Sequence, residues 1–222
     1  YGSLPNRWML GGALSAAGSV LTWYIEQFEH TSLQDAEGKE GLFNKLETDA
    51  SQVKPGAEGL FFLPHLMGER YPENPDARAV LYGLSLGHTR AHIARSMYEG
   101  IAFALRRAIR LIEETFQVKF RTIKAFGGGA KGQLLMRITA NVLASPILLP
   151  AEEELGSLGL ALIAAGVLNR SYPKGIYDRT IEAATRVEPE DQLVRKYDEL
   201  YQIFERIEGD MAQVYKHTAL LD

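Results

Sequence analysis

A short apolar segment at residues 122–126 leads directly into three consecutive glycines, and an amphipathic pattern at 131–143 follows them. Together they predict a strand, a sharp turn and a helix. Because glycine lacks a side chain, a ligand can approach the backbone closely at Gly127, Gly128 and Gly129. Unpaired N–H groups at the start of the next helix favour negative charge. The segment therefore predicts an anion or nucleotide cradle, and a purely conformational role for the glycines is the alternative.

Strand and helix patterns also alternate along the rest of the chain. Short apolar runs bounded by glycine or proline predict strands at residues 60–63, 79–86 and 146–149. Apolar spacing of three and four residues predicts helices at residues 14–28, 89–116 and 157–168. The segment 64–78 predicts a loop, and the polar residues 29–59 predict an exposed excursion with a short helix near 42–50. This alternation predicts an α/β fold.

The C-terminal segment, about residues 189–217, predicts one long amphipathic helix. Its apolar stripe consists of Val194, Tyr197, Tyr201, Phe204, Ile207, Met211 and Val214. A single apolar stripe does not identify its partner. We favour a terminal helix docked on the core of the same chain, and a dimer seam is the alternative.

Composition limits the classes of function. With 222 residues, 46% of them hydrophobic, the chain is long enough to bury a sizeable core as one domain. The net charge is −4, and no stripe of Lys and Arg is present, so nucleic acid is not expected as a partner. The chain has no Cys, which excludes a disulfide framework and fits the cytoplasm. No apolar run reaches the roughly 18 residues of a membrane span.

Gly18 and three histidines are further candidates for function. A glycine inside a helix costs about 1 kcal/mol relative to alanine, so either another helix or a ligand should lie close to Gly18. His88 and His92 are four residues apart and could bind a metal together, with His65 as a third ligand. The segment HTRAH has no Glu after its first His, so capping or core histidines are the favoured interpretation. No GxSxG motif is present to anchor a serine triad.

The segment AVLYGLSLGHTRAHIARSMYE, residues 79–99, resembles the second signature of the FGGY carbohydrate kinases, which include xylulose, ribulose, gluconate and glycerol kinases. The matching positions are Ala79, Leu81, Gly83, Leu84, His92, Ile93, Ser96, Met97, Tyr98 and Glu99. Three more segments resemble family segments in the right order: GGALSAAGSVLTW, GGGAKG and EEELGSLGLALIAAG. The resemblance covers the chain to about Gly166 and is closest to the xylulokinase-like branch.

The resemblance implies a ribonuclease H-like domain of the actin, hexokinase and Hsp70 type, a mixed sheet flanked by helices that forms the C-terminal, ATP-binding lobe over residues 1–222. The implied adenosine-binding loop comprises Gly127, Gly128, Gly129, Ala130, Lys131 and Gly132. Relatives often have a polar residue at the position of Gly132. Gly18 and Thr22 match positions near the nucleotide phosphates. The implied cofactors are ATP and Mg²⁺.

The resemblance places the catalytic aspartate and most of the sugar pocket in an N-terminal lobe. The family's Gly-Thr-Ser phosphate turn would lie upstream of Tyr1, so this chain is expected to be a truncated half of an enzyme with no catalytic residue of its own. The implied activity is transfer of the γ-phosphoryl of ATP to a hydroxyl of a pentulose or related sugar or polyol. Family members are often dimers, so a homodimer is implied as well. The competing interpretations are a non-catalytic nucleotide-binding or interaction module and a metal-dependent hydrolase around the three histidines.

Overall fold

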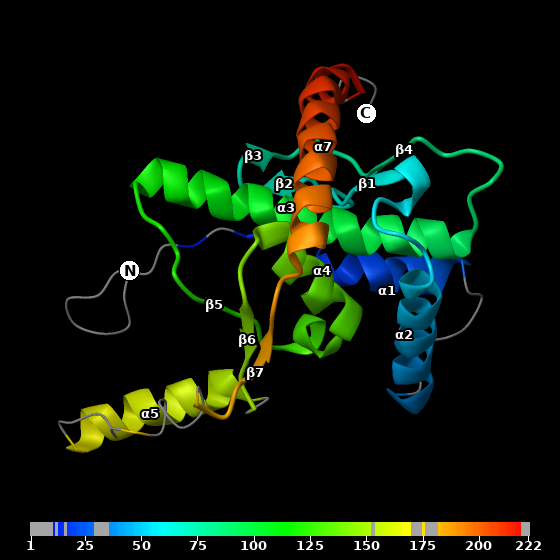
Figure 1. The fold of residues 1–222 in the computed structure, drawn as a ribbon. Helices are drawn as coiled ribbons and strands as arrows, with labels where there is room; N and C mark the ends of the chain where they lie inside the picture. Colours follow the sequence, from blue (N-terminus) through cyan, green and yellow to red (C-terminus); the bar gives the residue numbers. More distant parts are fainter. Residues whose placement is uncertain are drawn as a thin grey trace.

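Helix α3 (Arg90–Phe116) runs through the centre of the molecule, and most of the other elements pack along it (Figure 1). The computed structural model describes residues 11, 13–15, 17–28, 36–151, 154–169, 175 and 182–218. Thr89 and His92 form a capping box at the start of α3, in which the Thr89 amide donates to the His92 ring over 3.2 Å. Both ends of the helix agree with the prediction for residues 89–116.

Strand β1 (Phe61–Leu63) crosses α3 at Gly100, where the two backbones approach closely. A β-carbon on Gly100 would lie 2.1 Å from the carbonyl oxygen of Phe62. All three residues of β1 are buried. The strand pairs antiparallel with β4 (Val80–Tyr82), so this two-stranded sheet is held against the central helix.

The region after β1 differs from the sequence prediction in two ways. β4 ends at Tyr82 rather than near residue 86, because Gly83 has a φ of 88° and a β-carbon there would lie 2.4 Å from a backbone oxygen of Gly59. The predicted loop 64–78 contains a hairpin of β2 (Glu69–Arg70) and β3 (Glu73–Asn74). Each of its strands has only two residues, which is too short for an apolar alternation to show.

The second sheet has the strand order β5-β6-β7. β5 (Ile123–Lys124) and β6 (Ile147–Leu149) are parallel, and β7 (Thr185–Val187) is antiparallel to β6. This is the mixed sheet that the family resemblance implied. The connection from β5 to β6 contains a 3-10 turn, η2 (Gly128–Lys131), and helix α4 (Gln133–Leu143), which packs on α3.

Helix α7 (Asp191–Thr218) crosses α3 and α4, and its aromatic stripe is buried. The ring of Phe103 on α3 lies 6.1 Å from Tyr197, 6.0 Å from Tyr201 and 5.3 Å from Phe204, measured between centroids. Such aromatic clusters combine large buried areas with favourable ring geometry. The favoured prediction, a terminal helix docked on the core of the same chain, is therefore confirmed.

The remaining helices surround this core. α1 (Ala17–Phe28) and α2 (Ala36–Ser51) pack on α3, and the short helix η1 (Ala57–Gly59) lies between α2 and β1 in the chain. α5 (Leu155–Asn169) follows β6 and projects away from α3 in Figure 1. Within the described part of the chain, no helix has the length and apolar character needed to cross a membrane.

Candidate functional site

The segments that follow β5 and β6 lie at one edge of the mixed sheet. Ile123 pairs with Ile147 in the parallel register, and the Ala125 amide donates to the Leu148 carbonyl over 3.0 Å. Because the two strands run in the same direction, residues 125–131 and 149–151 leave the sheet on the same side. Open α/β sheets bind ligands outside the carboxyl ends of their strands.

A cavity of about 290 Å³ lies between these two segments. It is lined by Ala125, Phe126, Gly127, Gly128, Ala130, Lys131, Leu149, Pro150, Ala151 and Glu154. Four of the predicted site residues are thus brought together at one cavity: Gly127, Gly128, Ala130 and Lys131. Gly129 belongs to the same turn, and Gly132 directly precedes α4.

The three consecutive glycines differ in their backbone conformation. Gly127 has a φ of 82°, a conformation that favours glycine. Gly128 and Gly129 are not among the glycines with positive φ, and a β-carbon on either would meet no described atom within 4 Å. The conformational alternative therefore explains Gly127 alone. Neither backbone geometry nor packing within the described residues requires glycine at the next two positions.

The N-terminus of α4 is capped by another helix. The carboxylate of Glu47, on α2, accepts a hydrogen bond from the amide of Leu134. Carboxylates are favourable at this end of a helix because the backbone dipole is positive there. The sequence suggested unpaired N–H groups at this point, which is wrong for Leu134. The Leu134 amide is therefore not open to a bound anion.

Gly18 and Thr22 lie on α1 and do not line this cavity. Gly18 is exposed, and a β-carbon there would meet no described atom within 4 Å. Close packing of another described helix therefore does not account for this glycine. Gly18 thus lies on the exposed surface of α1 with open space beside it. That Gly18 and Thr22 lie near the nucleotide phosphates stays a prediction.

The three histidines do not converge on one metal site. The His92 ring caps α3 through Thr89, and the His88 ring accepts a 3.0 Å hydrogen bond from the Ser85 amide. This confirms the capping interpretation for His92, whereas His88 bonds to the turn that precedes α3. His65 is buried elsewhere, with its Nε2 2.6 Å from a carboxylate oxygen of Glu208.

His65 belongs to a compact charged cluster. Among the described residues, the one group with metal-ligand spacing is His65, Glu69 and Glu208, whose ligand atoms lie within 4.8 Å of one another. The guanidinium of Arg107 contacts Glu69 and lies 3.7 Å from Glu208. Burial raises the pKa of the Glu69 carboxyl, and Arg107 opposes that rise. The arginine provides the positive charge that a metal would otherwise supply.

Sequence reasoning did not identify the residues on the far side of the cavity, Leu149, Pro150, Ala151 and Glu154. It also did not single out Phe126, whose side chain is 64% exposed beside the glycines. The available signal was the predicted strand at residues 146–149. In a parallel pair, the segment after that strand has to lie beside the segment after 122–126.

The fold is thus an α/β domain with a cavity at the carboxyl ends of two parallel strands. The chain belongs to the FGGY family of carbohydrate kinases: residues 1–167 match the C-terminal domain of that family. The solved structure of a xylulose kinase from Rhodospirillum rubrum is similar over 91% of this chain and 40% of that one, with a TM-score of 0.76 and 27% identity. The fold is therefore that of the family's actin-like ATPase domain, as expected.

Sequence relatives include several kinds of carbohydrate kinase. A xylulose kinase of Lactococcus lactis is 33% identical over 227 residues, covering 98% of this chain and 41% of the relative. A gluconokinase of Bacillus licheniformis is 26% identical, covering 99% and 43%. A glycerol kinase of Citrifermentans bemidjiense is 34% identical over 195 residues, covering 85% and 37%. The chain thus spans about two fifths of the length of these relatives.

Proposed function

We propose that this chain is the ATP-binding lobe of a carbohydrate kinase that transfers the γ-phosphoryl of ATP to a hydroxyl of a pentulose or related sugar. The observation that carries the proposal is the open space at Gly128 and Gly129, beside a cavity of about 290 Å³. Two glycines that neither conformation nor packing requires are explained if a ligand occupies the space where their side chains would be.

The turn and its surroundings suit the adenosine part of the nucleotide. Apolar side chains of Leu149, Pro150 and Ala151 line one side of the cavity, and the exposed ring of Phe126 offers an aromatic face to a base. Lys131 adds a positive charge at the rim of the same cavity. A few polar groups on a mostly apolar lining are typical of small-molecule sites.

Phosphoryl transfer depends on positioning and on neutralisation of charge, which Mg²⁺ supplies when it is bound with the nucleotide. Glu154 is the one carboxylate among the residues that line the described cavity. We assign no metal ligand to this chain. Its proposed part in the reaction is to hold the nucleotide, while the base and most of the sugar site belong to the other lobe of the complete kinase.

A pentulose is the proposed substrate because the Lactococcus lactis xylulose kinase matches nearly the whole chain at 33% identity. The gluconokinase and glycerol kinase relatives keep gluconate and glycerol as the competing substrates. The 222-residue chain alone should bind adenine nucleotide weakly and should show no sugar-kinase turnover. Sugar-dependent release of ADP by this chain alone would contradict the assignment.

The test is calorimetric titration of the chain with Mg²⁺-ADP, with Gly128→Val as the variant. A Kd of up to about 1 mM, worth about 4 kcal/mol, is expected for the wild type. The valine side chain would enter the cavity without backbone strain, so binding should be lost while the chain stays folded. Gly41→Val is the matched control, because Gly41 lies exposed on α2 with open space around it. Unchanged binding by Gly128→Val would refute this site.

A further inference from the structure

The cavity beside the glycine turn has few side chains that can form hydrogen bonds. Among its ten described lining residues, only Lys131 and Glu154 have such side chains. A lysine ammonium group only donates hydrogen bonds, and an ionised glutamate only accepts them. Both residues also interact with other groups of the chain. The described lining therefore lacks the amide, hydroxyl and imidazole groups that can match a mixed pattern of donors and acceptors.

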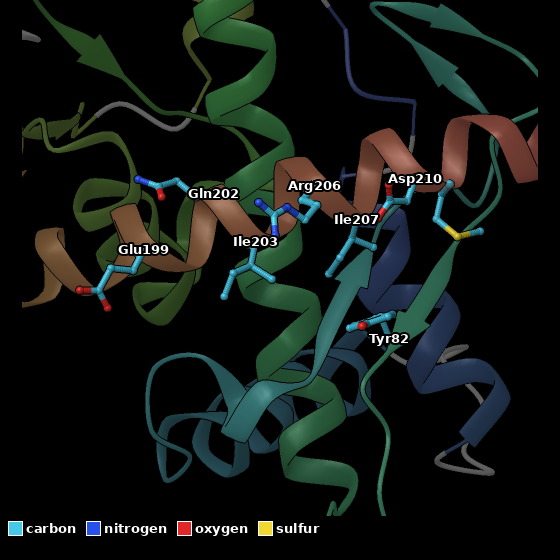
Figure 2. A pocket seen from close by; sticks show the side chains of 8 residues that line it. Tyr82, Glu199, Gln202, Ile203, Arg206, Ile207 and Asp210 are labelled. Atoms are coloured by element: carbon cyan, nitrogen blue, oxygen red, sulfur yellow. The ribbon is translucent and has the colours of Figure 1, made fainter.

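The groove on the outer face of α7 shows the contrast (Figure 2). Its volume is about 500 Å³, and Figure 2 shows the polar side chains that α7 contributes to it: Glu199, Gln202, Arg206 and Asp210. One helix thus supplies four hydrogen-bonding side chains to that groove. The scarcity of such groups is therefore a property of the cavity at the sheet edge and does not extend to every hollow in the described surface.

Two backbone amides beside the cavity are also already paired. The Ala130 amide donates to the Gly127 carbonyl over 3.0 Å, which closes the turn. The Ala125 amide donates to the Leu148 carbonyl over 3.0 Å, which joins β5 to β6. Neither amide is therefore open to a nucleobase.

Phe126 is the one aromatic residue among the described lining residues, and its side chain is 64% exposed. Every nucleobase has a π-face, so stacking on an aromatic ring tolerates different bases. Removing such a ring weakens binding by about fivefold or more. The exposure of Phe126 also shows that this part of the cavity is open to water. The edge of a base stacked there can stay hydrated, so it needs no hydrogen bond from the protein.

We propose that the cavity binds purine nucleotides by stacking on Phe126 and does not distinguish the groups at N1 and C6 of the purine ring. The inference rests on the proposed nucleotide site and defines which nucleotides occupy it. Adenine has an acceptor at N1 and an amino donor at C6, whereas hypoxanthine has an N–H donor and a carbonyl acceptor there. Sites built to hydrogen-bond such groups reject the wrong ligand by about 10⁴–10⁵-fold, because buried polar groups are left unpaired. The described lining has no matched set of this kind, so both bases are accepted.

Calorimetric titration of the 222-residue chain with Mg²⁺-ADP and with the Mg²⁺ complex of inosine diphosphate (IDP) tests the inference. The two ligands have the same phosphates, ribose and ring size, and they differ only at N1 and C6. Their Kd values should agree within about fivefold, which is about the net contribution of one hydrogen bond. A larger preference for either nucleotide overturns the inference and leaves the proposed function intact. Binding of neither nucleotide overturns the proposed function, and the inference with it.

Variants of Phe126 test the stacking itself. Phe126→Ala should weaken ADP and IDP binding by about fivefold or more and to the same extent, whereas Phe126→Tyr, which keeps the aromatic face, should retain both. Phe120→Ala is the matched control, because Phe120 is also exposed but does not line the cavity. It should bind both nucleotides as the wild type does. The urea midpoint of Phe126→Ala reports whether the variant is folded. A folded Phe126→Ala variant with unchanged binding overturns the inference.

Discussion

Replacing Gly100 with alanine is the sharpest test of how β1 is held on α3. In an open helix this substitution is stabilising, because glycine costs about 1 kcal/mol relative to alanine. At Gly100 the new β-carbon would lie 2.1 Å from the Phe62 carbonyl oxygen, whereas ordinary contact begins near 3.4 Å. The strand and the helix must therefore separate by about 1.3 Å, which is the difference between these two distances.

The expected cost follows from what has to move. The obstacle is backbone rather than the end of a flexible side chain, and β1 is buried and paired with β4. Forcing one extra methyl group into a packed core costs about 1–3 kcal/mol and occasionally more. Because buried backbone has to move, the upper end of that range, about 3 kcal/mol, applies here. After the gain of about 1 kcal/mol in helix propensity is subtracted, Gly100→Ala should lower the free energy of unfolding by about 2 kcal/mol.

Urea unfolding measures this difference, and a loss of about 2 kcal/mol should lower the midpoint by about 1 M. Gly41→Ala is the matched control, since it makes the same change in a helix with open space around the new methyl group. That control should raise the free energy of unfolding by about 0.5–1 kcal/mol. A Gly100→Ala midpoint equal to or above that of the wild type would refute the close approach of β1 and α3.

Two further predictions concern carboxylates that accept hydrogen bonds from backbone amides, those of Glu47 and Glu99. Glu47→Ala removes the acceptor for the Leu134 amide at the start of α4, so it should cost about 1 kcal/mol in thermal unfolding, and Glu47→Gln, which keeps an acceptor, should cost less. Burial raises the folded-state pKa of the Glu99 carboxyl above its ordinary value of 4.5, although Arg95 opposes the rise. The folded state then binds more protons between the unfolded and folded values, so Glu99 should make the free energy of unfolding fall as pH rises through that window. Urea unfolding at a series of pH values should show this fall relative to Glu99→Gln, and parallel curves would contradict it.

The long helices were predictable from sequence because their signals are local. Apolar spacing located α3, and the stripe containing Tyr197, Tyr201 and Phe204 located α7. The stripe alone could not tell which surface would cover it. The answer depends on Phe103, which is about a hundred residues away in the chain and is buried among these rings.

The strands β2, β3 and β7 escaped sequence reasoning for a physical reason. β7 has three residues, none of them fully buried, and is a strand because it pairs with β6. The cavity also depends on strand pairing. The glycine turn on one side of it was recognisable from the local sequence, but the residues on the opposite side lie next to that turn only because β5 and β6 pair in parallel. Strand β7 and the far side of the cavity were therefore missed because both depend on pairing between segments that are distant in the sequence.

Arg106 has a consequence for how the domain can move. From α3, its guanidinium donates to the Val142 carbonyl at the end of α4 over 2.9 Å and to Asp198 on α7 over 2.6 Å, and it lies 4.3 Å from the centroid of the Tyr201 ring. Moving any one of the three helices against the others would break at least one of these contacts. The positions of α3, α4 and α7 relative to one another are therefore coupled through this one side chain.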